Sequence, residues 1–209
     1  MMFAIASSLI FIVLLYLSRQ LRGYHRVLVL IAAAVTGLAI GLGVIPGFER
    51  INLGPISINS GKLVMGLALA FLLPSAWRWN QRCTILLITC LLVLPLAGIL
   101  LGYVTWRPAI SLLVLWFAIG NLVTVISEDF FFRRFIQDHL IRFGKLTEIM
   151  LTAALFGLVH LGGGIMFALL AAGAGIFYSA TYTASRSVWA VVVVHLALNL
   201  TSALLFGLP

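Results

Sequence analysis

The sequence opens with an apolar stretch as long as a lipid bilayer is thick, MFAIASSLIFIVLLYLS at residues 2–18, and similar stretches recur along the chain. A helix needs about 20 mostly apolar residues to cross a membrane. Hydrophobic residues make up 63% of the 209 and charged residues only 9%, whereas a soluble domain carries about a quarter charged residues. These values exclude a soluble globular protein, a disordered chain and a disulfide-stapled secreted module. They predict an all-α, polytopic membrane helix bundle.

Hydropathy predicts about eight spans in one membrane domain, residues 1–209. The first span has no basic residue before it and no small-residue cleavage site, so we expect an uncleaved membrane helix and not a secretory signal. The third and sixth spans are short. We place the spans at 2–18, 27–45, 62–77, 83–102, 109–127, 148–162, 164–182 and 188–206.

The basic residues predict how the spans are oriented. Of the 13 Lys and Arg, ten fall in alternate connections on one side and three, Arg50, Lys62 and Arg107, on the other. The positive-inside rule assigns the ten to the cytoplasm, so both termini face outward. The excess of positive charge then sets the topology, and no nucleic-acid partner is expected. The ten are Arg19, Arg22, Arg26, Arg78, Arg82, Arg133, Arg134, Arg142, Lys145 and Arg186.

Two adjacent acids follow directly on the fifth span. Glu128 and Asp129 precede FFFRRFIQDHL, which is too apolar for a free loop, so we expect the helix to continue through it in or near the membrane. Asp129 and Arg133 are then four residues apart on one face, in the favourable order for an ion pair. Glu128 lies about 100° around the helix from Asp129. The prediction is one paired carboxylate and one, Glu128, left for another role, because an ionisable group inside a membrane is a functional-site hypothesis by default.

Two histidines lie within later spans. His160 ends the run EIMLTAALFGLVH, with Phe156 four residues earlier on the same face. His195 lies inside VWAVVVVHLALNL, with Asn199 four residues later on the same face. No water satisfies an imidazole in lipid, so each histidine needs a partner. We therefore predict that these side chains and Glu128 meet in one polar cavity.

These groups suit two kinds of hydrolytic chemistry. A carboxylate and a neutral imidazole, Glu128 and His160, can deprotonate a water molecule. A second imidazole and an amide, His195 and Asn199, can donate hydrogen bonds to a developing oxyanion. Alternatively, Glu128, His160 and His195 form a three-ligand set for catalytic zinc. We favour the metal-free reading, without a cofactor, because an amide donor follows His195 at helical spacing.

Three motifs carry a resemblance to a known family. EDFFFR at 128–133 resembles EExxxR, FGLVH at 156–160 matches FxxxH, and HLALN at 195–199 matches HxxxN. In this order they resemble the CPBP (Abi) family of intramembrane proteases, which includes the Ras-converting CAAX prenyl endoproteases. The resemblance covers roughly 110–205, the expected catalytic core.

The resemblance implies residue roles. Glu128 and His160 would activate water, His195 and Asn199 would hold the oxyanion, and Arg133 would position the acidic pair, with Phe156 as a supporting residue. The chain departs from the family in one place: Asp129 stands where the family usually has a second Glu, which puts the reach of this second acid in doubt.

The resulting expectation is an intramembrane endopeptidase acting on a membrane-associated or lipidated protein or peptide. Two alternatives stay open, a non-enzymatic bacteriocin self-immunity or scaffold protein of the same fold, and a transporter whose midplane polar groups line a path. The short loops favour a multi-pass protein of the bacterial inner membrane, embedded in its lipid bilayer, with an active site open to the cytoplasmic side.

Overall fold

The computed structural model describes residues 2–108 and 112–207. The first three residues of the predicted fifth span, 109–111, lie outside this range. Helices account for nearly all of the secondary structure, so the predicted all-α bundle is confirmed. The helices are α1 Met2–Gln20, α2 Gly23–Gly41, α3 Ser60–Leu72, α4 Gln81–Leu100, α5 Leu112–Asp129, η1 Phe130–Gln137, α6 Asp138–Leu140, η2 Ile141–Phe143, α7 Lys145–Val159, η3 Leu161–Gly163, α8 Ile165–Ser185 and α9 Val188–Phe206.

Six helices in the described part of the chain are long and apolar enough to cross a membrane, and one of them is the continuous helical stretch Leu112–Phe143. Each of the eight predicted spans overlaps a helix, although the third, 62–77, extends five residues beyond the end of α3 at Leu72. The third and sixth correspond to α3 and α7, which have only 13 and 15 residues and fall short of the ~20 that a bilayer requires. The chain is an integral membrane protein in which two short helices pack among longer ones.

A β-hairpin in the predicted loop between the second and third spans was not expected. Strands β1 (Arg50–Leu53) and β2 (Ile56–Asn59) pair antiparallel through a two-residue turn. Gly54 opens this turn with φ of +63°, a conformation that suits glycine and is required at the first position of type II′ hairpin turns. The hairpin leads straight into α3, since the Asn59 side chain caps that helix by accepting from the Lys62 N–H.

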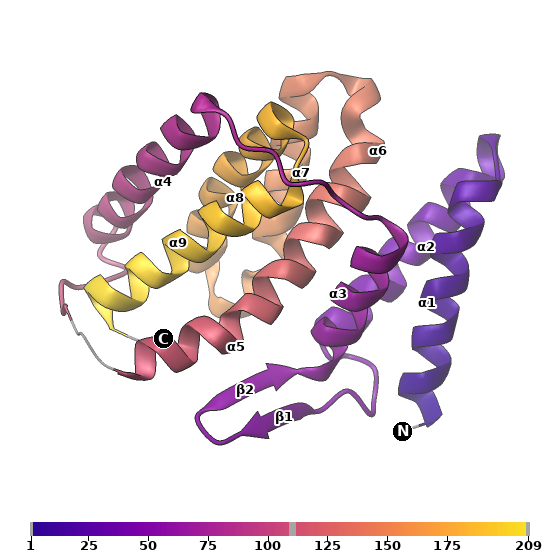
Figure 1. Ribbon diagram of the computed structural model, residues 1–209, viewed down its shortest axis with the longest axis horizontal. Coiled ribbons are helices and arrows are strands. Elements are labelled where there is room, and N and C mark those ends of the chain that lie inside the picture. Colours follow the sequence, from indigo (N-terminus) through magenta and orange to yellow (C-terminus); the bar gives the residue numbers. More distant parts are fainter. Residues whose placement is uncertain (1, 109–111, 208–209) are drawn as a thin grey trace.

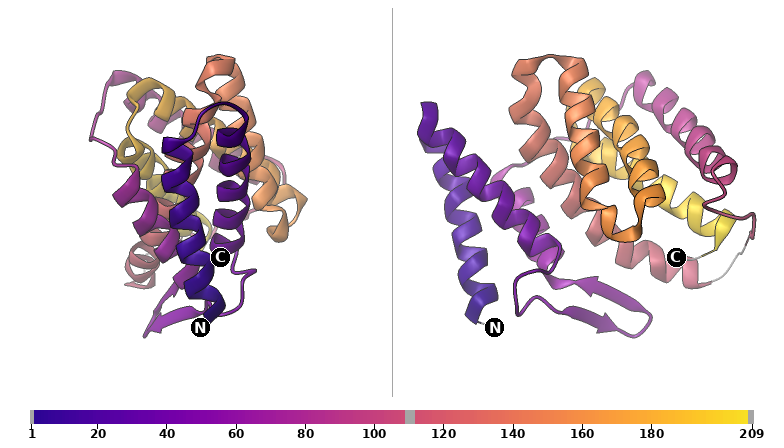
Figure 2. Two further views of the ribbon diagram at one scale, coloured as in Figure 1. Left: turned by 90° about the vertical axis from the view of Figure 1, so that its right-hand side faces the viewer. Right: turned by 180° about the vertical axis from the view of Figure 1, so that it is seen from behind.

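The helices run alternately up and down between two ends of the bundle (Figures 1 and 2). The α1–α2, α3–α4 and α8–α9 connections and the turn before α7 lie at one end, which we call the basic end because ten of the 13 Lys and Arg belong to these connections or lead into them. The hairpin, η3 and both described chain ends lie at the other. This alternation agrees with the charge pattern; which end faces the cytoplasm stays a prediction.

The core is densest where the C-terminal helices meet η1. Of the six long apolar helical stretches, α8 and α9 are the most buried and α2 and α4 the least, so α2 turns most of its surface outward. Helices α7 and α8 are in backbone contact, because a Cβ atom on Gly157 would lie 2.8 Å from the Ala168 carbonyl oxygen. This close approach fixes the end of α7, where His160 lies.

Candidate active site

The two adjacent acids lie at the end of α5, where the helix continues without a break into the π-helix η1, as predicted. Glu128 and Asp129 are both buried, 8% and 0% exposed. A π-helix has a wider turn than an α-helix and is frequent at functional sites. Its four phenylalanines, Phe130, Phe131, Phe132 and Phe135, are buried in the core. The apolar run therefore holds the two carboxylates inside the bundle.

Glu128 has an ion-pair partner that the sequence did not predict. Nζ of Lys62, on α3, lies 2.5 Å from Glu128 Oε1. The prediction of an unpaired Glu128 was therefore wrong. The reason is the short helix α3, which packs against α5 so closely that Ser127 Oγ donates to the Lys62 carbonyl oxygen at 2.5 Å. The ammonium compensates a carboxylate that would be costly to bury alone.

Asp129 contacts two groups. Its Oδ1 lies 3.8 Å from Nε of Arg133, so the predicted i,i+4 pair is present. Its Oδ2 lies 3.2 Å from Nδ1 of His195 on α9, a contact that the sequence did not predict. A carboxylate beside Nδ1 fixes the ring orientation and leaves Nε2 as the nitrogen that can act elsewhere. Asp129 thus links the first and the third motif.

Arg133 is fully buried and held from several sides. Nη1 donates to Ser179 Oγ at 2.7 Å, and the guanidinium lies over the rings of Phe156 and Tyr178, 5.3 Å and 5.8 Å from their centroids. Among the described residues, Nε and Nη2 make no hydrogen bond. A buried guanidinium with unused donors depends strongly on its one carboxylate, that of Asp129.

His160 caps the end of α7 and packs against the second motif's phenylalanine. Its Nδ1 lies 2.6 Å from the Phe156 carbonyl oxygen, and the two rings are 4.5 Å apart. Because a carbonyl oxygen only accepts, Nδ1 carries the proton and Nε2 is the nitrogen that can accept one. Phe156 also contacts the His195 ring at 5.8 Å, so a single aromatic side chain separates the two imidazoles.

The three predicted acid–base residues are neighbours. Both His160 and His195 lie close enough to the Glu128 carboxylate to interact with it electrostatically. Glu128 comes from α5, His160 from the end of α7 and His195 from α9. A carboxylate and two imidazoles in a buried setting provide the groups that general acid–base catalysis needs.

Asn199 meets a partner that the sequence analysis missed. Its Nδ2 donates to Oδ1 of Asn121 on α5 at 3.1 Å. Asn121 precedes Glu128 by seven residues, two helical turns, and so shares its face. That spacing, a polar residue two turns before an acid inside an apolar span, was the signal that could have revealed it. The amide pair ties α9 to α5 beside the acids.

Tyr178 was also missed. Its ring stacks on His195 with centroids 4.3 Å apart and an interplanar angle of 25°, and it is 1% exposed. Together with Asp129, Tyr178 fixes the plane of the His195 ring.

The described residues contain no group of three or more His, Cys, Asp and Glu side chains arranged to hold a metal ion. In this arrangement the Glu128 Oε1 atom binds Lys62, and Nδ1 of each histidine faces an oxygen atom. These contacts use neither Glu128 Oε2 nor Nε2 of either histidine, so the zinc alternative with Glu128, His160 and His195 stays a prediction.

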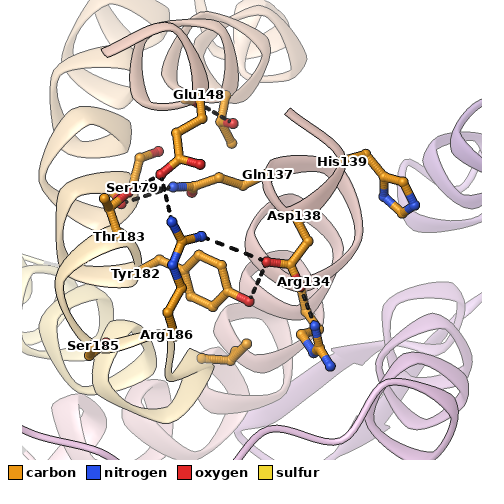
Figure 3. A network of polar contacts seen from close by, with 12 residues as sticks. Arg134, Gln137, Asp138, His139, Glu148, Ser179, Tyr182, Thr183, Ser185 and Arg186 are labelled. Atoms are coloured by element: carbon orange, nitrogen blue, oxygen red, sulfur yellow. Dashed lines mark hydrogen bonds and ion pairs between the residues drawn. The ribbon is translucent and has the colours of Figure 1, made fainter. Parts of the chain in front are cut away.

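A second polar cluster lies toward the basic end (Figure 3). Glu148, buried in α7, accepts from Thr183 Oγ1 at 2.6 Å and from Arg186 Nη2 at 3.1 Å. Gln137 donates to the Ser179 carbonyl oxygen and to Thr183 Oγ1 at 3.0 Å each. We call these five residues, Gln137, Glu148, Ser179, Thr183 and Arg186, the basic-end network. It contains neither of the predicted catalytic histidines.

Comparison with known proteins bears directly on the motifs. Residues 108–201 match the family model described as type II CAAX prenyl endopeptidase Rce1-like. No curated protein and no solved structure gives a significant match. The matched segment spans all three motifs, from Glu128 to Asn199. The predicted resemblance is confirmed: residues 108–201 of this integral membrane protein are similar to the type II CAAX prenyl endopeptidases, a family of proteases.

Proposed function

We propose that the protein is an intramembrane endopeptidase that hydrolyses a peptide bond of a membrane-associated or lipidated protein or peptide. One observation carries the proposal: the imidazoles of His160 and His195 both pack against Phe156, and His195 contacts Asp129, the residue next to the buried Glu128, inside the segment that matches a protease family. A packing role alone would not require three ionisable groups from three helices in a membrane, because each is costly to bury.

In this mechanism Glu128 and His160 activate the water. The Lys62 contact uses Oε1 of Glu128, and we assign Oε2 to the water, since a carboxylate has two accepting oxygens. Nε2 of His160 is the second acceptor, because Nδ1 faces the Phe156 carbonyl oxygen. The hydroxide that forms attacks the scissile carbonyl carbon, and the proton taken from water passes to the leaving amine.

His195 and Asn199 stabilise the oxyanion. An imidazolium at His195 would donate from Nδ1 to Asp129 and from Nε2 to the oxyanion. The Asn199 amide has two N–H donors; one goes to Asn121, and the other is assigned to the oxyanion. Donors fixed in advance inside a buried site typically contribute about 10²–10³-fold to the rate.

Asp129 and Arg133 act as positioning residues. Asp129 holds the His195 ring through Nδ1, and Arg133 holds Asp129 while its Nη1 is anchored on Ser179. Asp is one methylene shorter than the Glu usual in the family, and it still reaches both partners. Positioning residues of this kind matter because a small misplacement of reacting groups lowers the rate by orders of magnitude.

The proposal is metal-free. With Lys62 on one carboxylate oxygen of Glu128, hydrolysis by a general base uses the site as it is arranged. We expect exhaustive chelation of the purified protein to leave cleavage unchanged, measured together with bound metal by mass spectrometry. Stoichiometric zinc whose removal abolishes cleavage, and whose return restores it, would make the protein a metalloprotease instead.

The experiment that tests the function uses the full chain reconstituted in lipid nanodiscs. A fluorogenic peptide ending in a CAAX sequence is supplied in farnesylated and unmodified forms, and cleavage is followed by mass spectrometry. Membrane proteins crosslinked to a Glu128→Gln variant, but not to the wild type, identify the natural substrate. A wild type that neither cleaves these peptides nor captures a substrate through the variant would favour the non-enzymatic immunity or scaffold role.

A further inference from the structure

A pocket of about 290 Å³ opens at the basic end and lies outside the proposed active site. Arginines from three separate elements line it: Arg78 in the α3–α4 connection, Arg134 in η1 and Arg186 after α8. Asp138 is the single acid in its lining. Three positive charges against one negative leave the lining with a net charge of +2, which favours an anionic ligand.

Two of the arginines are held in place without being enclosed. Arg134 pairs with Asp138 one helical turn later, and its Nε donates to the Pro74 carbonyl oxygen at 3.3 Å. Arg186 pairs with Glu148. Figure 3 shows both guanidinium groups turned toward the Asp138 side chain. Their side chains are still 35% and 34% exposed, so each retains surface for a ligand.

The backbone of Arg186 has a left-handed conformation that is unusual for a residue with a side chain. This residue ends α8 with φ of +52°, in the left-handed region, and it is the single non-glycine residue with positive φ in the described ranges. A side chain in this conformation costs about 1–2 kcal/mol relative to glycine. Glycine is the usual residue at such a helix end. The strain is consistent with a requirement for the arginine side chain at this place.

The α3–α4 connection, which lines one side of the pocket, is hydrogen-bonded to α9. In the α3–α4 connection the Ser75 hydroxyl accepts from the Val188 N–H, and the Ser75 carbonyl oxygen accepts from Trp189 Nε1, both at 2.9 Å. Figure 1 shows this connection running across the basic end. It carries Arg78, which is exposed, so a third guanidinium is presented to the pocket by an anchored segment.

The aromatic residues around Arg78 indicate the depth of the pocket in the membrane. Trp77 and Trp79 flank it and stack on each other with centroids 6.1 Å apart and an interplanar angle of 11°. Trp77 is 59% exposed. Tryptophans of this kind concentrate at the level of the lipid headgroups. The tryptophan pair therefore favours a position for the pocket at the level of the phosphate groups of the bilayer.

From these observations we propose that this arginine pocket binds a phosphate group, carried by an anionic phospholipid headgroup or present as free phosphate. Guanidinium groups bind phosphate oxygens in pairs through parallel N–H donors, and anionic lipids are recognised by basic pockets between membrane helices. Tyr182 closes one side of the site, since its hydroxyl donates to Asp138 at 2.9 Å and it lines the same pocket.

The test measures ligand-dependent thermal unfolding of the full chain in detergent. The probes are dihexanoyl phosphatidylglycerol, dihexanoyl phosphatidylcholine and sodium phosphate, at equal ionic strength. We expect phosphatidylglycerol to raise Tm saturably, with Arg78→Gln weakening its apparent Kd at least about fivefold, because one of the charge-assisted bonds is lost. Arg78 is exposed, so this variant should keep its unliganded Tm.

The matched control is Arg22→Gln, which removes the same charge from the same end of the bundle in the α1–α2 connection, away from the pocket. Its Kd should stay within about twofold of the wild type. A saturable effect of sodium phosphate alone, equally sensitive to Arg78→Gln, would assign the site to free phosphate. Equal weakening in both variants would show nonspecific attraction and overturn the proposal, as would the absence of any saturable shift.

Discussion

Two buried glutamates, Glu128 at the candidate active site and Glu148 in the basic-end network, each pair with a cation, yet their surroundings differ. Glu148 accepts from a hydroxyl and a guanidinium, Thr183 and Arg186, on the same oxygen. Glu128 binds a single ammonium, that of Lys62, and the imidazoles of His160 and His195 lie within electrostatic range of it.

This difference separates a structural carboxylate from one suited to chemistry. Hydroxyl and guanidinium donors near Glu148 hold a fixed negative charge, and none of them readily exchanges a proton at neutral pH. Imidazoles exchange protons in that range. A carboxylate beside imidazoles can therefore pass a proton on, whereas Glu148 can only hold its helices together.

The largest effect is expected from replacing each glutamate by its amide. Glu128→Gln keeps the side-chain shape but removes the base, so kcat/KM for peptide cleavage should fall by about 10³-fold or more. Glu148→Gln should instead lower the free energy of unfolding by about 1–3 kcal/mol, because Arg186 loses the nearer of its two carboxylate partners. Cleavage per folded molecule and thermal unfolding are measured on both variants.

The proposed difference between a catalytic Glu128 and a structural Glu148 is contradicted if the folded Glu148→Gln protein loses cleavage as completely as Glu128→Gln. It also fails if Glu128→Gln cleaves at the wild-type rate, since no role in activating water could then be assigned to Glu128.

A second pair of variants compares the two aspartates. Asp129→Ala leaves the fully buried Arg133 without its carboxylate, and breaking a buried pair costs about 3–5 kcal/mol. The folded yield should fall together with activity. Asp138→Ala breaks pairs with Arg134 and Arg186 that are partly exposed, and such pairs contribute about 0–1 kcal/mol.

Thermal unfolding and the yield of monodisperse protein measure both changes. Loss of cleavage by Asp129→Ala at full thermal stability would show that Asp129 takes part in the chemistry directly and is more than a positioning residue.

The smallest effect is expected at Lys62, which belongs to the N-terminal part of the chain. Lys62→Met removes the counter-charge of Glu128 and should lower kcat about tenfold, because an uncompensated buried carboxylate is disfavoured in its charged form. Lys62→Arg restores the charge and should recover most of the rate. If Lys62→Met cleaves faster than the wild type, the ammonium inhibits Glu128 instead of supporting it.

Much of the architecture follows from side-chain chemistry that the sequence displays. Apolar runs without charge must form helices in lipid, because every backbone polar group needs a partner within its own segment. The acid–base candidates were found for a related reason, since Glu128, His160 and His195 are ionisable groups within apolar runs, where few such groups are tolerated. The pairing of Asp129 with Arg133 followed from helical periodicity alone.

The rest depends on how helices distant in the sequence pack together. Lys62 was placed at the outer end of the third predicted span, and only the contact between α3 and α5 shows that it meets Glu128. The His195–Asp129 contact joins residues 66 apart. The hairpin was missed although Gly54 and the alternation in RINLGPISIN are signals for one, because the segment was treated as a loop between spans.

Gly66 has a consequence for the modularity of this protein. A Cβ atom there would lie 2.4 Å from Ser127 Oγ, so α3 touches α5 at the residue before Glu128. The family match begins only at residue 108, and α3 lies outside it. A chain shortened to the matched segment would expose this face of α5 and lose the ammonium that accompanies Glu128. The segment that matches the family model is therefore smaller than the set of helices that builds the site, and transplanting the motifs alone would not transfer it.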